Sequence, residues 1–586
     1  MTLLAIVLIS AIVLTVAYFT YGPLLARLLQ LDPAAETPAV ALRDDVDYAP
    51  IEPKFLLSQH FSAIAAAGPI VGPIVAGVAF GWLPAWLWIL FGSVLIGGVH
   101  DFTTLVASIR HNARSIAEVV RDHMSMRAYL LFLAFVWLSL VYIIVAFTDV
   151  TASAFVGALE LDDGHRTSIT GGGVATSSLL YLVLPIVMGL LLRYTRLTIG
   201  WATLIFLPLV GVAIWVGQKI PFDVEQLFHL EPLDAKRVWN IALLAYCFVA
   251  SVIPMWLLLQ PRGHLGGYFL YLALGGGMLG VVVGAVTGGG QIEYPQFTGW
   301  VAPYGPSKGE ALFPMLFVLI ACGACSGFHS VIASGTTSKQ LRRETDARLI
   351  GYGAMLLEAM VAVVSLCCVM KLSVGHKLID KGPNYLYAVG VGDFLSVLGI
   401  PVALGVSFGL MAFTTFVYDT LDVCTRLGRY ILQELTGRHD RLGRWGSTAV
   451  TAAVPLFFLL QPPTLDAEGK AIPAWRVFWS LFGASNQLLA ALTLLGVTVW
   501  LWQTRRVWWV WLVTGVPAAL MYTMSTWALV SIIEQKFAAG MTYDPVPWVA
   551  VVLIILAILM LAEAAWVIAG PNRLGAGGLR PEEAVS

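Results

Sequence analysis

Charged residues are scarce in this sequence. Aspartate, glutamate, lysine and arginine make up 12% of its 586 residues, whereas hydrophobic residues make up 58%. A soluble domain carries roughly twice that share of charge, so the composition excludes an ordinary soluble protein and predicts one that lies in a membrane. The formal net charge of -1 offers no basic surface to a polyanion, so we expect no nucleic acid among its partners.

The sequence also lacks the residue patterns that many catalytic and metal sites need. Its six cysteines are scattered, and the pair Cys322 and Cys325 has neither a second pair nor a histidine cluster to complete a zinc site. It contains no P-loop and no H-E-x-x-H pattern. We therefore predict no enzyme, no metal site and no cofactor, and we interpret the cysteines as small core residues.

Long apolar runs, in contrast, are abundant. About fifteen of them are long enough to cross a bilayer at roughly 1.5 Å of rise per residue. The shorter segment 385–399 is polar at both ends and is predicted to be a re-entrant or interfacial helix. We expect membrane lipid to surround the protein and leave its oligomeric state open. The predicted spans are 3–27, 59–81, 84–109, 127–157, 178–194, 198–217, 238–260, 266–287, 312–334, 347–374, 401–433, 446–461, 474–502, 507–533 and 547–569.

The distribution of positive charge predicts the orientation. Most of the 34 lysines and arginines fall on one side when the spans alternate with the N-terminus outside and the C-terminus in the cytoplasm. Arg262 is counted here as a residue of a cytoplasmic loop. The segments predicted to be cytoplasmic include 110–127 and 335–346, and those predicted to be external include 158–177 and 288–311.

The second predicted span, within residues 58–82, is not a plain apolar helix. Two Gly-Pro pairs lie near its centre, and each proline lacks an N–H and disfavours a helical conformation in the residue before it. Backbone that is unwound at mid-membrane is tolerated where protein or a water-filled cavity satisfies it, so this break is a candidate binding site. A proline kink packed against its neighbours is the alternative. The predicted substrate-binding residues here are Gly68, Pro69, Gly72 and Pro73.

A second interruption is predicted five spans later, in the oppositely directed span 238–260. Ser251 and Pro254 lie just past its centre and complete the predicted substrate site. Two interrupted helices in this relation predict an all-α polytopic membrane protein with a five-plus-five inverted-repeat core and extra C-terminal helices, although a chance placement of prolines is the alternative. The predicted units are 1–58 for an N-terminal helix and cytoplasmic loop, 59–217 for the first repeat, 238–434 for the second, and 446–570 for a C-terminal appendage.

Ionisable residues within the predicted spans are candidates for ion coupling. A charge at membrane depth costs a few kcal/mol, so such residues usually face a cavity or a partner. His100 and Asp101 are adjacent, and neighbours on a helix do not face each other, so each is expected to need its own partner. The predicted ion-coupling residues are His60, His100, Asp101, Asp149, His329, Ser330, Ser334, Glu358 and Asp419.

Some of these polar residues have a purely structural alternative. Asp422 and Arg426 are four residues apart, which suits an ion pair on one helix face, and we predict that this pair is structural. A hydrogen-bonded core histidine is the alternative for His60 and for His329. The coupling role therefore depends on whether the polar side chains meet in space.

Four stretches carry a resemblance to a known family. They are HFSAIAAAGPIVGPIVAGVAFGWLPAWLWILFGSVLIGGVHDF at 60–102, CSGFHSVIASGTTSKQL at 325–341, DTLDVCTRLGRYILQE at 419–434 and LFGASNQLLAALTL at 481–494. In this order they resemble the signature of the carbon starvation protein A family. The resemblance runs from about residue 50 to 500. It implies an inner-membrane transporter, linked to nutrient limitation, that imports peptides or pyruvate, and a leucine-transporter-like core of the amino acid–polyamine–organocation superfamily.

The sequence thus predicts a secondary active transporter in the bacterial inner membrane that imports peptides or a small carboxylate such as pyruvate. The number of titratable groups favours H+ as the coupling ion. A Na+ route stays open because Ser330 and Ser334 share a helix face. A channel and a membrane sensor are further alternatives, which the paired breaks and the lack of a soluble signalling domain disfavour.

Overall fold

The protein is helical almost throughout. Its computed structural model describes residues 2–44, 48–160, 168–305, 307–465, 471–541 and 544–569. Within these residues, 12 helices are long and apolar enough to cross a membrane, or 13 if one bent pair is counted as a single span. The all-α polytopic fold is confirmed, but the predicted count of about fifteen spans is not. Two predicted spans are absent from this set. The segment 312–334 is interrupted, and the helix over 446–461 does not combine the length and hydrophobicity that a membrane span needs.

The chain up to residue 286 forms long helices joined by short helical or extended segments. Two short strands near residue 160 pair as a small antiparallel hairpin. The elements are α1 (Leu3–Leu28), α2 (Pro38–Ala41), α3 (Pro53–Ile64), α4 (Gly68–Phe80), α5 (Trp82–Gly92), the π-helical turn η1 (Ser93–Gly97), α6 (Gly98–Arg110), α7 (Ile116–His123), α8 (Met126–Ser153), β1 (Ala158–Glu160), β2 (Ser168–Thr170), α9 (Gly171–Tyr194), α10 (Ile199–Lys219), α11 (Val224–Phe228), α12 (Pro232–Val252) and α13 (Leu259–Val286).

The rest of the chain is built in the same way and contains the longest helix. A second short hairpin precedes the last three long helices. The elements are α14 (Leu312–Leu319), α15 (Phe328–Ile332), the π turn η2 (Ala333–Thr337), the 3-10 turn η3 (Glu344–Asp346), the π turn η4 (Arg348–Gly353), α16 (Ala354–Met370), α17 (Leu378–Lys381), α18 (Pro383–Ser396), α19 (Val402–Thr436), α20 (Arg441–Leu459), β3 (Thr464–Leu465), β4 (Ala471–Ile472), α21 (Ala474–Arg505), the π turn η5 (Trp511–Gly515), α22 (Val516–Ala538) and α23 (Pro545–Ala569).

The second span is broken as predicted, but the break lies before the two Gly-Pro pairs, which belong to the helix that follows it. Helices α3 and α4 meet at an angle of 47° across the short segment 65–67. Pro69 lies in the first turn of α4. A proline is accepted there because its missing N–H has no partner in the first turn of a helix. Pro73 continues inside α4.

The second interruption lies elsewhere than predicted. Helix α12 ends at Val252, and Ser251 and Pro254 belong to its end and to the turn before α13, so the prediction of an unwound centre there is wrong. The interrupted span is instead 312–334, where α14 and α15 are separated by residues 320–327. This segment reads IACGACSG and holds no proline, so small residues and not prolines mark the break.

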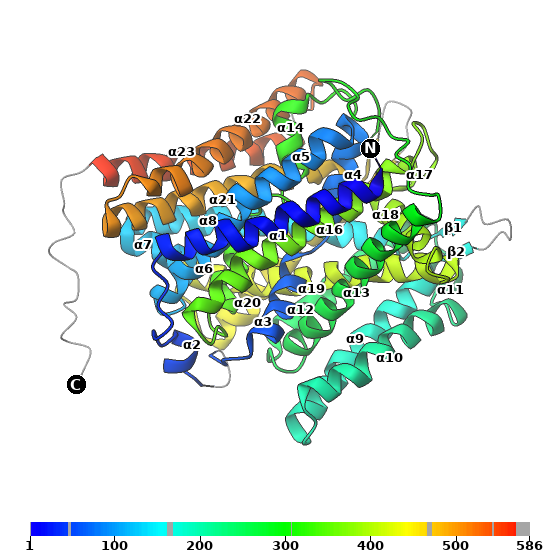
Figure 1. Cartoon of the computed structure of the whole chain (residues 1–586), viewed down its shortest axis with the longest axis horizontal. Helices are drawn as coiled ribbons and strands as arrows, with labels where there is room; N and C mark the ends of the chain where they lie inside the picture. Colours follow the sequence, from blue (N-terminus) through cyan, green and yellow to red (C-terminus); the bar gives the residue numbers. More distant parts are fainter. Residues whose placement is uncertain are drawn as a thin grey trace.

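The two interrupted spans are followed by similar elements. Each interrupted span precedes a span with a π-helical turn, η1 in one case and η4 in the other. Helix α12 packs on α8, α19 and α20, while α13 packs on α3 and α19. Helices α12 and α13 therefore contact spans of both predicted repeats, and these contacts do not assign them to either one. The α9–α10 hairpin lies at one edge in Figure 1. The predicted boundaries 59–217 and 238–434 stay predictions.

Loops that were predicted to share a membrane face do lie together. Arg110 Nε donates to Glu344 Oε1 at 2.8 Å, and the Thr37 hydroxyl donates to the Leu341 carbonyl. These contacts place the segments 110–127 and 335–346 at one face. At the opposite face, the N–H of Leu3 donates to the carbonyl of Gly290. Figure 1 shows the first helix entering there, at the same end as β1, β2 and α17.

The orientation of these two faces in the membrane can be tested by cysteine labelling. We expect a single cysteine at Lys308 to react with a membrane-impermeant maleimide on intact cells, and one at Arg114 to react only after the cells are opened. Both positions are exposed, whereas Ser307 is buried and unsuitable. The six native cysteines are buried, so the background should be low. Labelling at Arg114 but not at Lys308 in intact cells would reverse the orientation.

Candidate functional site

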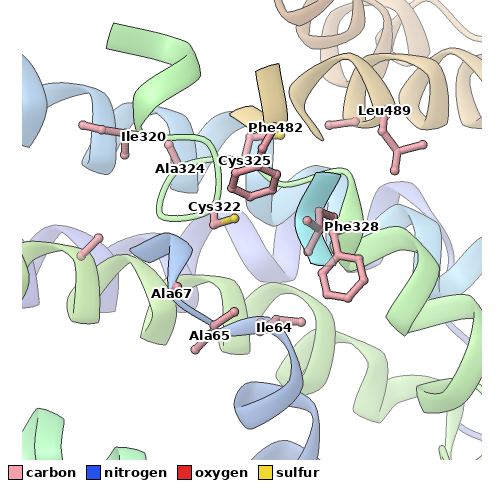
Figure 2. Packing of buried hydrophobic residues seen from close by; sticks show 14 of the residues in the cluster. Ile64, Ala65, Ala67, Ile320, Cys322, Ala324, Cys325, Phe328, Phe482 and Leu489 are labelled. Atoms are coloured by element: carbon pink, nitrogen blue, oxygen red, sulfur yellow. The ribbon is translucent and has the colours of Figure 1, made fainter. Parts of the chain in front are cut away.

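The two interrupted spans cross with their backbones in contact. A Cβ at Gly72 would lie 2.3 Å from the Leu319 carbonyl oxygen, and one at Gly68 would lie 2.3 Å from Cys322 Cβ. Glycine is therefore required at both positions for the spans to approach this closely. Figure 2 shows the first break, at Ala67, beside the segment that carries Cys322. Gly72, predicted to bind substrate, thus lies against the backbone of the second interrupted span.

A chain of buried ionisable side chains lies at this crossing. Asp101 of α6 bridges two histidines, with Oδ1 2.7 Å from His100 Nδ1 and Oδ2 2.7 Å from His329 Nδ1. His329, on α15, also faces Glu358 of α16, with 3.2 Å between Nε2 and Oε2. All four side chains are fully buried. Four of the predicted coupling residues therefore meet, and they link α6 with α15 and α16.

The contact between His100 and Asp101 corrects one expectation. Adjacent residues were predicted to need separate partners, yet the two side chains bond to each other. This is achieved because a carboxylate has two oxygens, so Asp101 accepts from His100 with one and from His329 with the other. The pair is thus one part of a longer network.

His329 lies between two carboxyl groups. Because a carboxylate only accepts, His329 Nδ1 carries the hydrogen that faces Asp101. On the other side Nε2 lies 3.2 Å from Glu358 Oε2, although neither atom has a hydrogen-bond partner within the part of the chain that the structure describes. A proton placed between them can sit on either group, giving a charged ring and an ionised Glu358 or a neutral ring and a protonated Glu358. The contact is attractive while this proton is present. When the proton leaves, the Nε2 lone pair faces an ionised carboxylate and the attraction is lost.

His60 ties the first interrupted span to the second. Its Nδ1 lies 2.8 Å from the hydroxyl of Thr337 on η2, and its Nε2 has no hydrogen-bond partner among the described residues. Thr337 was not among the predicted residues, because a threonine in an apolar span gives no distinct signal. Across the described ranges, no group of three or more His, Cys, Asp or Glu residues is placed to hold a metal ion.

A second polar network surrounds Arg262 of α13. Its Nε donates to Asp419 Oδ1 at 2.5 Å, its Nη1 pairs with Asp422, and its Nη2 donates to the Tyr418 carbonyl at 3.0 Å. The hydroxyl of Ser62, on α3, donates to the other oxygen of Asp419. Arg262 and Asp422 are fully buried, and Asp419 nearly so. Two carboxylates therefore share one guanidinium.

This network corrects two sequence-based predictions. Arg262 is not in a cytoplasmic loop, and Asp422 does not pair with Arg426. Arg426 instead donates to the carbonyls of Ala250 and Ile253, each at 2.7 Å. Carbonyls at a helix C-terminus lack partners within the helix and attract cations, which explains this choice. Arg262 was missed because α13 begins before it, where the sequence suggested a loop.

A narrow crevice lies between the His60–Thr337 pair and the Arg262 network. Its volume is about 20 Å³, room for roughly one water molecule. His60 and Thr337 line one side, and Arg262 and Asp419 line the other. The lining continues to Gln340, in the segment 335–346, so the crevice leads toward the face predicted to be cytoplasmic.

Three predicted coupling residues lie outside both networks. Asp149 pairs with Lys236 at 2.8 Å, beside a pocket of about 580 Å³ near the far end of α8. Ser330 donates to the carbonyl of Gly327 and Ser334 to that of Ser330, so both hydroxyl hydrogens are used within their own helical segment. The structure thus brings together His100, Asp101, His329 and Glu358, pairs His60 with Thr337, and places Asp419 across the crevice from His60.

Comparison with known families agrees with this architecture. The family model described as "Carbon starvation protein CstA" matches residues 2–379 and 371–528. The chain belongs to the CstA family. A relative from Helicobacter pylori strain J99, named "Peptide transporter CstA", is 32% identical over 86% of this chain and 78% of its own length. A relative from Escherichia coli K12, named "Pyruvate/proton symporter BtsT", is 32% identical over 89% of this chain and 81% of its own.

Two solved structures are also similar to this CstA-family chain. One is the Eremococcus coleocola manganese transporter in complex with an aromatic bis-isothiourea compound. It is 13% identical, with a TM-score of 0.49, and the match covers 90% of this chain and 98% of that one. Another is MhsT in complex with L-phenylalanine, at 11% identity and a TM-score of 0.45, covering 86% of this chain and 98% of that one.

Proposed function

We propose that this CstA-family protein is a secondary active transporter of the bacterial inner membrane that imports a peptide or a small carboxylate, such as pyruvate, together with protons. The N-terminus lies outside and the C-terminus in the cytoplasm. The names of the two relatives support the substrate class, and one of them names the proton. The inside-negative membrane potential favours entry of a cation with the substrate, by about 2.3 kcal/mol per charge per 100 mV.

The observation that carries the proposal is the chain from His100 through Asp101 and His329 to Glu358. Ionisable groups at membrane depth are costly and are typical of proton pathways. These four side chains come from α6, α15 and α16, which meet where the interrupted spans cross. A proton gained or lost between His329 and Glu358 changes the charge of this contact, and that change can favour one arrangement of these helices over another.

Sodium coupling is the second candidate. It would use Ser330 and Ser334 with carbonyl oxygens of an interrupted span. Both hydroxyls donate within their own segment, and the oxygen of Ser330 also accepts from the Thr493 hydroxyl at 3.1 Å, so each oxygen keeps at least one lone pair. The convergence of titratable side chains favours the proton.

Uptake into proteoliposomes separates the two candidates. With the purified protein, labelled pyruvate and labelled dialanine should be tested under an imposed pH gradient and, separately, under an imposed sodium gradient. We expect one of them to accumulate when the outside is more acidic, and a protonophore to abolish the accumulation. Accumulation driven by sodium at equal pH, and insensitive to a pH gradient, would overturn proton coupling.

A further inference from the structure

We propose that Arg262 binds the carboxylate of the substrate, and that Asp419 releases this guanidinium to the substrate by taking up a proton. The inference rests on the transport function proposed above and assigns the substrate's anchoring group. Peptides and pyruvate share a carboxylate, so one cationic side chain in the core can serve either class.

Arg262 has the chemistry and the position for this role. A guanidinium presents a planar fork of N–H donors that matches a carboxylate, and it stays charged when buried. Arg262 is fully buried in α13, yet it lines the crevice that His60 also lines. The His100–Asp101–His329–Glu358 chain contains two carboxyl groups and offers a bound anion no fixed cation of this kind.

The charge balance around Arg262 explains why a proton must accompany the anion. One guanidinium faces two carboxylates, Asp419 and Asp422, so the network already carries one negative charge in excess. A third carboxylate would raise this excess to two in an environment that screens charge poorly. If Asp419 first takes up a proton, its Oδ1 leaves Arg262 Nε and the substrate carboxylate occupies that position. The excess stays at one, so the anion and the proton enter the site together.

Asp419 is better placed than Asp422 to take the proton. Asp419 lines the crevice, whereas Asp422 does not and is held from behind by the hydroxyl of Tyr246, at 2.7 Å. Asp422 therefore stays with Arg262 and keeps the guanidinium in place during the exchange. Two charged or titratable groups face Asp419 directly, Arg262 and Tyr181. Asp422 and Tyr246 lie beyond the guanidinium, and His60 lies across the crevice.

The test measures how pyruvate changes the melting temperature of the purified full-length protein between pH 5 and pH 8. The unaltered protein should be stabilised more strongly at acidic pH. The neutral ester methyl pyruvate should not stabilise it. Ser62→Ala removes a donor that favours ionised Asp419, so the pH midpoint of pyruvate binding should rise by about one unit. Ser365→Ala is the matched control, since this buried serine donates only to the Val361 carbonyl of its own helix.

Two further variants test the two named groups. Asp419→Asn is neutral at every pH, so its pyruvate binding should become independent of pH. Arg262→Lys loses the fork, so its pyruvate affinity should fall by about tenfold or more. An unchanged pH midpoint in Ser62→Ala together with pH-dependent binding in Asp419→Asn would overturn the inference, as would unaltered affinity in Arg262→Lys. If the last two variants fail to fold, Ser62→Ala decides alone.

The result also separates this inference from the transport proposal. If the unaltered protein binds pyruvate and accumulates it under a pH gradient, but the variants bind as it does, only the assignment of Arg262 and Asp419 fails. If the unaltered protein neither binds nor accumulates pyruvate or dialanine, the transport proposal fails and this inference fails with it.

Discussion

Asparagine in place of Asp101 should leave the protein folded and reduce proton-driven uptake by about tenfold or more. Asp101 accepts from both His100 and His329, and its negative charge favours the charged form of the His329 ring. Asparagine has nearly the same shape but no charge, and it has one acceptor oxygen where the carboxylate has two. The proton shared between His329 and Glu358 should then be held too weakly to drive accumulation. Initial uptake rates in proteoliposomes under an imposed pH gradient measure the effect.

Asp393→Asn is the control for this variant. Asp393 is partly exposed and pairs with Lys371 at 3.0 Å, away from the crossing of the interrupted spans, so its loss should leave uptake nearly unchanged. Asp101→Asn should also keep its pyruvate-dependent rise in melting temperature, because the Arg262 network is separate. Proton-driven uptake at the unaltered rate in Asp101→Asn would exclude this side chain from coupling.

Valine in place of Gly72 should disrupt the core itself. The added Cβ would lie 2.3 Å from the Leu319 carbonyl oxygen and 3.3 Å from Ile320 Cα, and both are backbone atoms that cannot rotate away. Forced overpacking of this kind typically costs about 1–3 kcal/mol and more when backbone must move. We expect a clear fall in the melting temperature in detergent and uptake at background level.

Gly211→Val provides the matched control for the Gly72 substitution. Gly211 lies within α10, and a Cβ there would meet nothing within 4 Å. Its melting temperature and uptake should be close to those of the unaltered protein. If Gly72→Val melted at the same temperature as Gly211→Val, the two interrupted spans would not be packed backbone to backbone.

Prolines located the first interrupted span from the sequence but not the second. The Gly-Pro pairs at Gly68 and Gly72 lie just after the break, because a proline fits the first turn of a new helix. The second break consists of small residues, which also occur in continuous packed helices, so periodicity alone does not distinguish it. The prediction of a break at Pro254 was wrong because a proline can mark the end of a helix as readily as an interruption within it.

The coupling residues were predictable in kind but not in arrangement. His329 and Glu358 stood out because charge at membrane depth is rare, and the structure joins them. Arg262 could not be assigned because it lies close to the start of α13, where a helical residue and a loop residue look alike in sequence. The partner of Asp422 could likewise not be predicted, because Arg262 and Asp422 are far apart in the sequence and meet only when their helices pack together.

The central claim is that substrate and proton cross the membrane together. It is tested most directly by recording the internal pH of proteoliposomes that hold a trapped pH-sensitive dye, with equal pH on both sides, no sodium, and the potential clamped at zero. Adding external pyruvate or dialanine should acidify the interior with the unaltered protein. Asp101→Asn should give at most about a tenth of that rate. Entry of labelled substrate without internal acidification would contradict the account.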